Sequence, residues 1–152
     1  MKKFISFLTV LGLIFSMNGF CFASGPIVES QTISMETLED GTTVETILTI
    51  YKNPSRSQDK NASVTKNYTG PGNEKAASIT LYASFSYDGS RAWSDYAYSD
   101  VTEYNRWGYE NENINYGGST ATLSARLTKS GESSKSVSMY IKCSSNGEIT
   151  SN

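Results

Sequence analysis

The feature that most constrains the fold is an alternation of apolar and polar residues around two Asp-Gly pairs. Asp40-Gly41 and Asp88-Gly89 each stand between two alternating runs. Asp-Gly is a strong signal for a two-residue hairpin turn, because that turn needs positive φ at both central residues. Alternation with a period of two is typical of strands that bury one face. The sequence therefore predicts antiparallel β-hairpins.

Pairing across a two-residue turn predicts which side chains of the first hairpin face the core. With Asp40-Gly41 as the turn, Ile33 lies opposite Leu48 and Met35 lies opposite Thr46. Most apolar residues of residues 28–51 then fall on one face. Because a shift of one residue would reverse every side chain, the pattern and the turn together predict the register.

The same rule applied to Asp88-Gly89 places aromatic residues on both faces of the second hairpin. Tyr96 is expected opposite Leu81 and Tyr98 opposite Ile79, on the core face. Trp93 falls on the other face. We therefore expect Trp93 to be the more exposed ring of this hairpin.

A third hairpin, with its turn at residues 130–133, follows near the end of the sequence. By alternation its core-facing row is apolar on both strands: Ala121, Leu123, Ala125, Leu127, Val137, Met139, Ile141 and Cys143. Residues 52–62 are predicted to be a loop before a short strand at 64–69, and residues 101–116 to add one or two strands. Seven to nine short strands predict an all-β, two-layer antiparallel β-sandwich, with a partly closed β-barrel as the alternative.

The first 23 residues have the pattern of a secretory signal peptide. Lys2 and Lys3 precede an apolar segment that is too short to span a bilayer, and Cys21-Phe22-Ala23 places small residues at a cleavage site. Phe20 is the wrong neighbour for a lipoprotein-type anchor at Cys21. We therefore expect a secreted, extracellular protein with no stable membrane anchor, with residues 24–152 forming a single all-β domain.

The composition of the expected mature chain restricts its chemistry. Two of the 13 basic residues and none of the 15 acidic ones lie in the signal, which leaves 11 against 15 and a net charge of −4. Nucleic acid is not an expected partner of such a chain. There is no His, the usual general base and metal ligand, so neither a cofactor nor a metal is expected. Cys143 is the only thiol after residue 23, and its place on the apolar face predicts a buried side chain, with pairing between two chains as the alternative.

Sequence similarity is visible in the second half of the chain. Trp107-Gly108-Tyr109, Gly117–Leu123 and the closing stretch Ser136–Ile149, which holds Cys-Ser-Ser-Asn-Gly, resemble a group of small exported Ser/Thr/Tyr-rich β proteins of Firmicutes. This resemblance implies export and a β fold. No activity is established for that group, so the resemblance assigns a role to no residue.

Aromatic and acidic residues are concentrated between residues 93 and 116. Aromatic rings can cover the apolar face of a sugar while carboxylates and amides bind its hydroxyl groups, and rings of this kind also dominate protein interfaces. Strand alternation would instead send about half of these rings into the core. The candidate ligand contacts are the rings expected to be exposed, which are Trp93 first and then Trp107 and Tyr109. The first hypothesis is a secreted, non-catalytic domain that binds an extracellular glycan or protein surface.

Two other functions fit the sequence less well. A small exported bacteriocin-like or membrane-active toxin could insert an amphipathic hairpin such as residues 120–143, although any half-buried hairpin has the same pattern. A small glycoside hydrolase would need two acids in one cleft, for which the candidate pairs are Asp95 with Glu103 and Glu110 with Glu112. We do not expect an enzyme. The ligand and the oligomeric state are not predictable from the sequence.

Overall fold

The computed structural model describes residues 27–52 and 58–152, in which nine strands and no helix are found. The signal peptide predicted at residues 1–23 lies outside this range. The strands are β1 (Ile27–Thr37), β2 (Thr43–Lys52), β3 (Asp59–Thr69), β4 (Lys75–Tyr87), β5 (Ala92–Glu103), β6 (Gly108–Asn115), β7 (Thr120–Thr128), β8 (Lys135–Cys143) and β9 (Ile149–Ser151).

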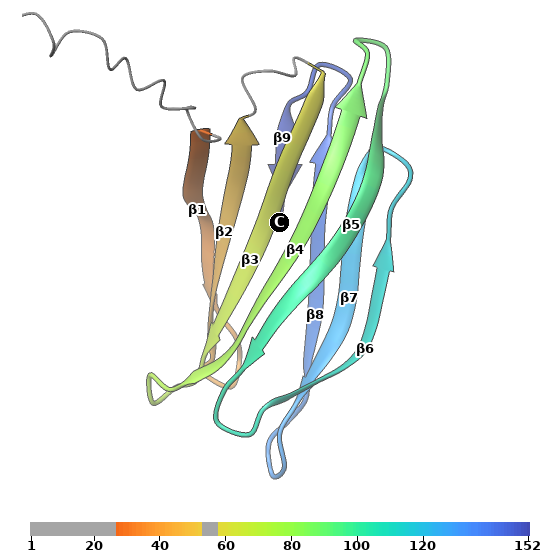
Figure 1. Cartoon of the computed structure of the whole chain (residues 1–152). Helices are drawn as coiled ribbons and strands as arrows, with labels where there is room; N and C mark the ends of the chain where they lie inside the picture. The colour runs from red at the N-terminus through yellow and green to blue at the C-terminus, as the bar shows by residue number, and fades with distance from the viewer. Residues whose placement is uncertain (1–26, 53–57) are drawn as a thin grey trace, which may run out of the picture.

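The strands form two antiparallel sheets that pack face to face. The larger sheet has the order β1-β2-β3-β4-β5 and the smaller has the order β6-β7-β8-β9. Figure 1 shows the smaller sheet behind β3, β4 and β5, while β1 lies beyond it at the edge. This arrangement confirms the predicted two-layer β-sandwich.

The core lies between the two sheets and is built from alternate residues of their strands. β4 contributes Ile79, Leu81 and Phe85, all fully buried. The apolar row predicted for the third hairpin faces them, with Leu123 paired to Met139 and only Ala125 of that row less than fully buried. In this hairpin the predicted face is confirmed on both strands, because no bulge interrupts either of them.

The register of the first hairpin differs from the prediction by one residue next to the turn, and by two residues beyond a bulge at Ile33. Leu38 donates its N–H to the Thr42 carbonyl and accepts from Gly41, so three residues rather than two form the turn, and Gly41 has φ +82°. Met35 consequently lies opposite Glu45, and its side chain is 67% exposed. The predicted inward orientation of Met35 is wrong.

The second hairpin departs from the prediction in two ways. Four residues, 88–91, separate the paired Tyr87 and Ala92, and a bulge lies at Asp95 between the pairs Phe85–Ser94 and Ser84–Tyr96. A bulge places two residues opposite one and reverses the alternation beyond it. Tyr96 and Tyr98 therefore face outward, which corrects their predicted place in the core.

The strands between the hairpins are longer than the sequence pattern indicated. β3 begins at Asp59, whereas the prediction placed a loop up to residue 62, of which residues 53–57 are not described here. Because β3 begins at Asp59, it pairs with β4 from Asp59 to Thr69 and with β2 from Asn61 to Thr69. Among residues 27–52 and 58–152, no helix is long and apolar enough to cross a membrane.

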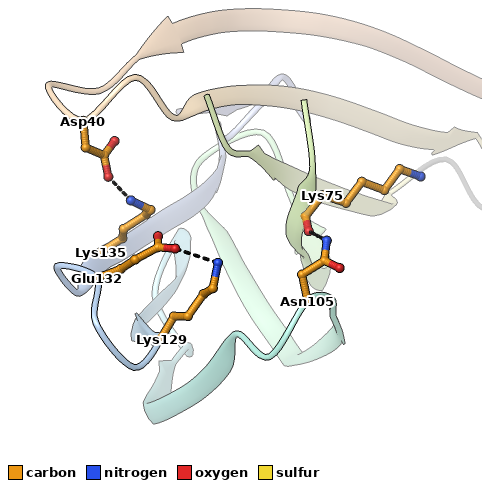
Figure 2. Close-up of polar contacts among 6 residues, drawn as sticks. All are labelled: Asp40, Lys75, Asn105, Lys129, Glu132 and Lys135. Carbon is orange, nitrogen blue, oxygen red and sulfur yellow. Dashed lines mark hydrogen bonds and ion pairs between the residues drawn. The ribbon is translucent and has the colours of Figure 1, made fainter. Parts of the chain in front are cut away.

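Several polar contacts lie at one end of the sandwich, as Figure 2 shows, and one of them joins the two sheets. Asp40, in the β1–β2 turn, forms an ion pair with Lys135 at the start of β8. The hydrogen bond from the buried Lys135 ammonium, aided by the Thr42 N–H, lowers the pKa of Asp40 from 3.8 to about 2. On the same end, Asn105 donates to the Lys75 carbonyl over 2.7 Å. These contacts tie the turns of separate hairpins together.

Candidate functional site

The three aromatic residues predicted as ligand contacts do not form one site. Trp93 lies on the outer face of the larger sheet, paired with Ser86, and is half-buried. The guanidinium of Arg91 lies 5.3 Å from its ring centroid. Trp107 and Tyr109 lie in and after the connection from β5 to β6. Only Trp93 is therefore on an outer sheet face, as expected. The expectation that it is the more exposed ring of its hairpin is wrong, because Tyr96 and Tyr98 are exposed to a greater extent.

Trp107 is part of the core, and the expectation that its ring is exposed is wrong. Its side chain is 5% exposed. The ammonium groups of Lys135 and Lys129 lie 5.0 Å and 5.5 Å from its ring centroid. Cations at this distance from an aromatic face are attracted by its negative charge density. The ring thus anchors the corner between the sheets.

Tyr109 is half-buried and its polar groups are already bonded within the chain. Its N–H donates to Glu103 over 2.6 Å, and its hydroxyl donates to Glu112 over 2.8 Å. Burial, followed by the hydrogen bond to Glu112, raises the pKa of the Tyr109 hydroxyl. Glu112 also accepts from Ser99 of β5. Tyr109 and the carboxylates of Glu103 and Glu112 therefore hold β5 and β6 together at the β5–β6 corner, the place where the chain passes from one sheet to the other.

The other acids of the predicted catalytic pairs also bond to neighbouring strands. Asp95 accepts from Ser86 over 2.8 Å, and Glu110 accepts from Thr128 over 3.0 Å. A glycosidase needs one acid to protonate the leaving group and another to attack or activate water. In this structure each of the four carboxylates in the predicted pairs accepts a hydrogen bond from a backbone or side-chain group of the chain.

A different set of aromatic residues forms a hollow on the outer face of the larger sheet. We call it the tyrosine hollow; its volume is ≈ 300 Å³. That size is at the lower end of small-molecule sites, which occupy about 300–1,000 Å³. Its side-chain lining consists of Tyr51, Asn61, Tyr82, Tyr96 and Tyr98.

The rings of the tyrosine hollow are arranged by the pairing of β4 with β5. Tyr82 and Tyr98 are direct cross-strand partners, and their ring centroids are 4.8 Å apart with planes inclined by 11°. Tyr96 and Tyr98 are 6.1 Å apart and inclined by 8°. Tyr96 and Tyr98 are nevertheless 51% and 49% exposed. Because the rings stack on one another, a ligand can stack only on the ring faces that this row leaves in solvent.

Polar groups lie between the rings of the tyrosine hollow. The Tyr51 hydroxyl lies 3.3 Å from the hydroxyl of Ser63, and Asn61 is exposed beside it. Burial, with smaller contributions from Tyr51, Tyr98 and Asp100, raises the pKa of Tyr82. The Tyr82 phenol is therefore a neutral donor and acceptor at physiological pH. The hollow combines apolar ring surfaces with uncharged hydrogen-bonding groups.

Part of this hollow was predictable from the alternation of residues, and part was not because of the bulge in β5. Tyr82 alternates with the core residues of β4, so its outward direction follows from the pattern. Tyr96 and Tyr98 reach the same face only because Asp95 adds one residue to β5. Nothing in the local sequence of the strand reveals that addition. The hollow becomes visible only when the pairing is known.

Cys143 has the buried position that the alternation predicts. Its side chain is fully buried among core residues, and burial raises the pKa of the thiol. A protonated, enclosed thiol is a poor nucleophile. Within the described part of the chain, no group of three or more His, Cys, Asp and Glu side chains is placed to hold a metal ion.

Comparisons with known proteins add no functional information. No protein-family model matches the chain, and neither the curated proteins nor the solved structures yield a match. The functional argument therefore depends on the geometry of the chain itself.

Proposed function

We propose that this chain is secreted and binds an extracellular glycan, without catalysis, through the tyrosine hollow. The observation that carries the proposal is the row of nearly parallel rings of Tyr82, Tyr98 and Tyr96 on a sheet face, of which Tyr96 and Tyr98 are half-exposed. An exposed aromatic cluster needs a reason, because large rings normally contribute most when they are buried. A stacked sugar would cover these rings and leave their hydroxyl groups at its edges.

The polar lining favours a glycan over a protein surface as the ligand. A protein hot spot usually combines aromatic residues with a dry, apolar surround. Here the exposed Asn61 lines the hollow together with the rings, and each tyrosine ring carries its own hydroxyl group. A sugar has the same alternation, with C–H groups on its faces and hydroxyl groups around its rim.

The engagement of the acids supports binding without hydrolysis. Asp95 is hydrogen-bonded to Ser86, and Glu112 is bonded to Ser99 and Tyr109. The β7–β8 hairpin, which a membrane-active toxin would insert, has its apolar row in the core. A glycan-binding role requires neither a reactive acid nor a rearranged hairpin.

The proposal is tested by retention of the purified protein on insoluble polysaccharides, namely chitin, cellulose and peptidoglycan sacculi. We expect saturable depletion from solution by at least one of them and no release of reducing sugar. A variant with both Tyr96→Ala and Tyr98→Ala should bind at least tenfold more weakly, which is about 1.4 kcal/mol of binding free energy. Both side chains are half exposed, so the melting temperature should change little.

The matched control is Tyr140→Ala, which removes a ring from the outer face of the smaller sheet. This variant should bind as the wild type does. Retention by none of the three polysaccharides would overturn the proposal. Equal weakening by the control and by the double variant would show that the hollow is not the site.

A further inference from the structure

A second hollow lies on the same outer face of the larger sheet, on the side nearer the β3–β4 turn. We call it the Glu45 hollow; its volume is ≈ 370 Å³. The side chains that matter here are Glu45 of β2, Asn67 of β3, Lys75 and Ser78 of β4, and Tyr104 just after β5. None of them was singled out by the sequence.

The Glu45 hollow is a connected polar network with an aromatic ring at its rim. Asn67 donates to one oxygen of Glu45 over 3.1 Å and accepts from Ser78 over 2.8 Å. The Lys75 ammonium lies 5.6 Å from the centroid of the Tyr104 ring. A carboxylate has about four acceptor positions, so Glu45 keeps capacity for the hydroxyl or amide donors of a ligand.

One row of short side chains separates the two hollows. The cross-strand pairs that form this row are Ile47–Thr65, Thr65–Thr80 and Thr80–Asp100. The hydroxyls of Thr65 and Thr80 are 2.9 Å apart, so the middle of the row is held close to the sheet. Along β4, the outward residues Ser78 and Tyr82 belong to different hollows and are ~13 Å apart, four residues at about 3.3 Å each.

We propose that the two hollows are subsites for one extended glycan chain that lies along the strands and crosses the Thr65–Thr80 row. The inference rests on the proposed function, and adds the length and linkage class of the ligand. A β-1,4-linked chain of glucose or N-acetylglucosamine units is straight and presents flat ring faces, as this path requires. In the tyrosine hollow it would stack, and in the Glu45 hollow it would be hydrogen-bonded.

The charges beside the path select against an anionic polymer. Asp100 is exposed at one end of the central row, and Glu45 lies in the second hollow. At ~0.1 M salt charges act over about 10 Å, so both carboxylates would repel an acidic chain lying between them. Among the residues that the structure describes, Lys75 is the one cationic side chain that lines the Glu45 hollow. The expected ligand is an uncharged chain.

The test measures affinity against chain length by calorimetry, with soluble oligosaccharides as probes. Chitobiose and chitohexaose, and cellobiose and cellohexaose, are compared on the same protein. We expect the matching hexasaccharide to bind at least tenfold more tightly than its disaccharide. Asn67→Ala and Tyr104→Ala should bring the hexasaccharide to the affinity of the disaccharide, while leaving disaccharide affinity unchanged.

The outcomes separate this inference from the proposed function. Equal affinities for short and long chains, or an unchanged length dependence in Asn67→Ala and Tyr104→Ala, would overturn the two-subsite inference and leave the tyrosine hollow as a one-sugar site. Tighter binding of hyaluronan, an anionic chain, than of either uncharged hexasaccharide would overturn the selection by charge. Absence of binding to every oligosaccharide would overturn the linkage class if the protein is still retained on an insoluble polysaccharide, and the proposed function itself if it is not.

Discussion

Two groups of aromatic residues in this chain have similar sequence surroundings and different structural roles. Tyr96 and Tyr98 lie among Ser and Asp residues on a strand, and their rings remain half exposed. Trp107 and Tyr109 lie among Glu and Asn residues only a few positions later, and their rings close the β5–β6 corner. Aromatic residues beside acids are thus not evidence of a binding site. What distinguishes the two groups is whether the other sheet covers them.

The largest test of this comparison is removal of the corner ring. Trp107→Ala empties a buried site and should lower the free energy of unfolding by about 3–5 kcal/mol. Trp93→Ala removes a half-buried ring on the outer face and should cost about 1 kcal/mol, a typical value for a mutation outside the core. Urea denaturation measures both. Similar losses for the two variants would contradict the distinction between corner and face.

An intermediate effect is expected from acidification. The contact of Asp40 with Lys135, which also lies against the Trp107 ring, depends on charge, whereas the tyrosine hollow does not. The pKa of Asp40 is about 2 in the folded chain and 3.8 in the absence of its partners. A lowered carboxyl pKa stabilises the fold above the unfolded value, and this contribution is lost as the carboxylate is protonated. Stability should therefore be constant in this respect above pH 4 and fall between about pH 4 and pH 2.

The control for this pH dependence is Asp40→Asn, which keeps the size of the side chain and removes its charge. Measured by thermal unfolding, the variant should be less stable than the wild type near neutral pH. Its stability should also lack the part of the decline below pH 4 that is caused by protonation of Asp40. An identical decline in both proteins would show that other carboxylates are responsible. Glycan binding at neutral pH should be the same in both.

The smallest effect is expected from deletion of Asp95. Since Asp95 is the extra residue of the bulge, its removal leaves Trp93 outward, Ser94 inward and Tyr96 outward. The loss of its hydrogen bond with Ser86 should cost about 1 kcal/mol. Thermal unfolding and glycan binding report on stability and on the hollow. In a strand without the bulge, the same deletion would turn Tyr96 from the core to solvent, and the protein would lose its stability.

How far the fold was predictable depended on the turns and bulges rather than on the alternation. The β7–β8 hairpin followed its pattern, because both strands are regular and one apolar row is buried. Met35 was misplaced because its turn has three residues instead of two. Tyr96 and Tyr98 were misplaced by one extra residue. In each case a local change of a single position reversed the side chains that follow it, as far as residue 34 in β1 and beyond Asp95 in β5.

For the candidate site, the sequence predicted the types of residue but not which of them lie together. Trp107 lies in a connection, where no alternation indicates which way a ring points, and its burial depends on Lys135 and Lys129 from the second sheet. The tyrosine hollow joins Tyr51 with Tyr82 and Tyr98 across strands that are far apart in the sequence. Neither arrangement has a local signal.

The amino-acid sequence by itself determined the secondary structure class, the sandwich and the inward row of the last hairpin, because these follow from period-two burial along each strand. The tertiary structure alone decided which aromatic rings face solvent and which of them meet. That decision depends on pairing between strands, where one bulged residue outweighs the composition of the entire segment.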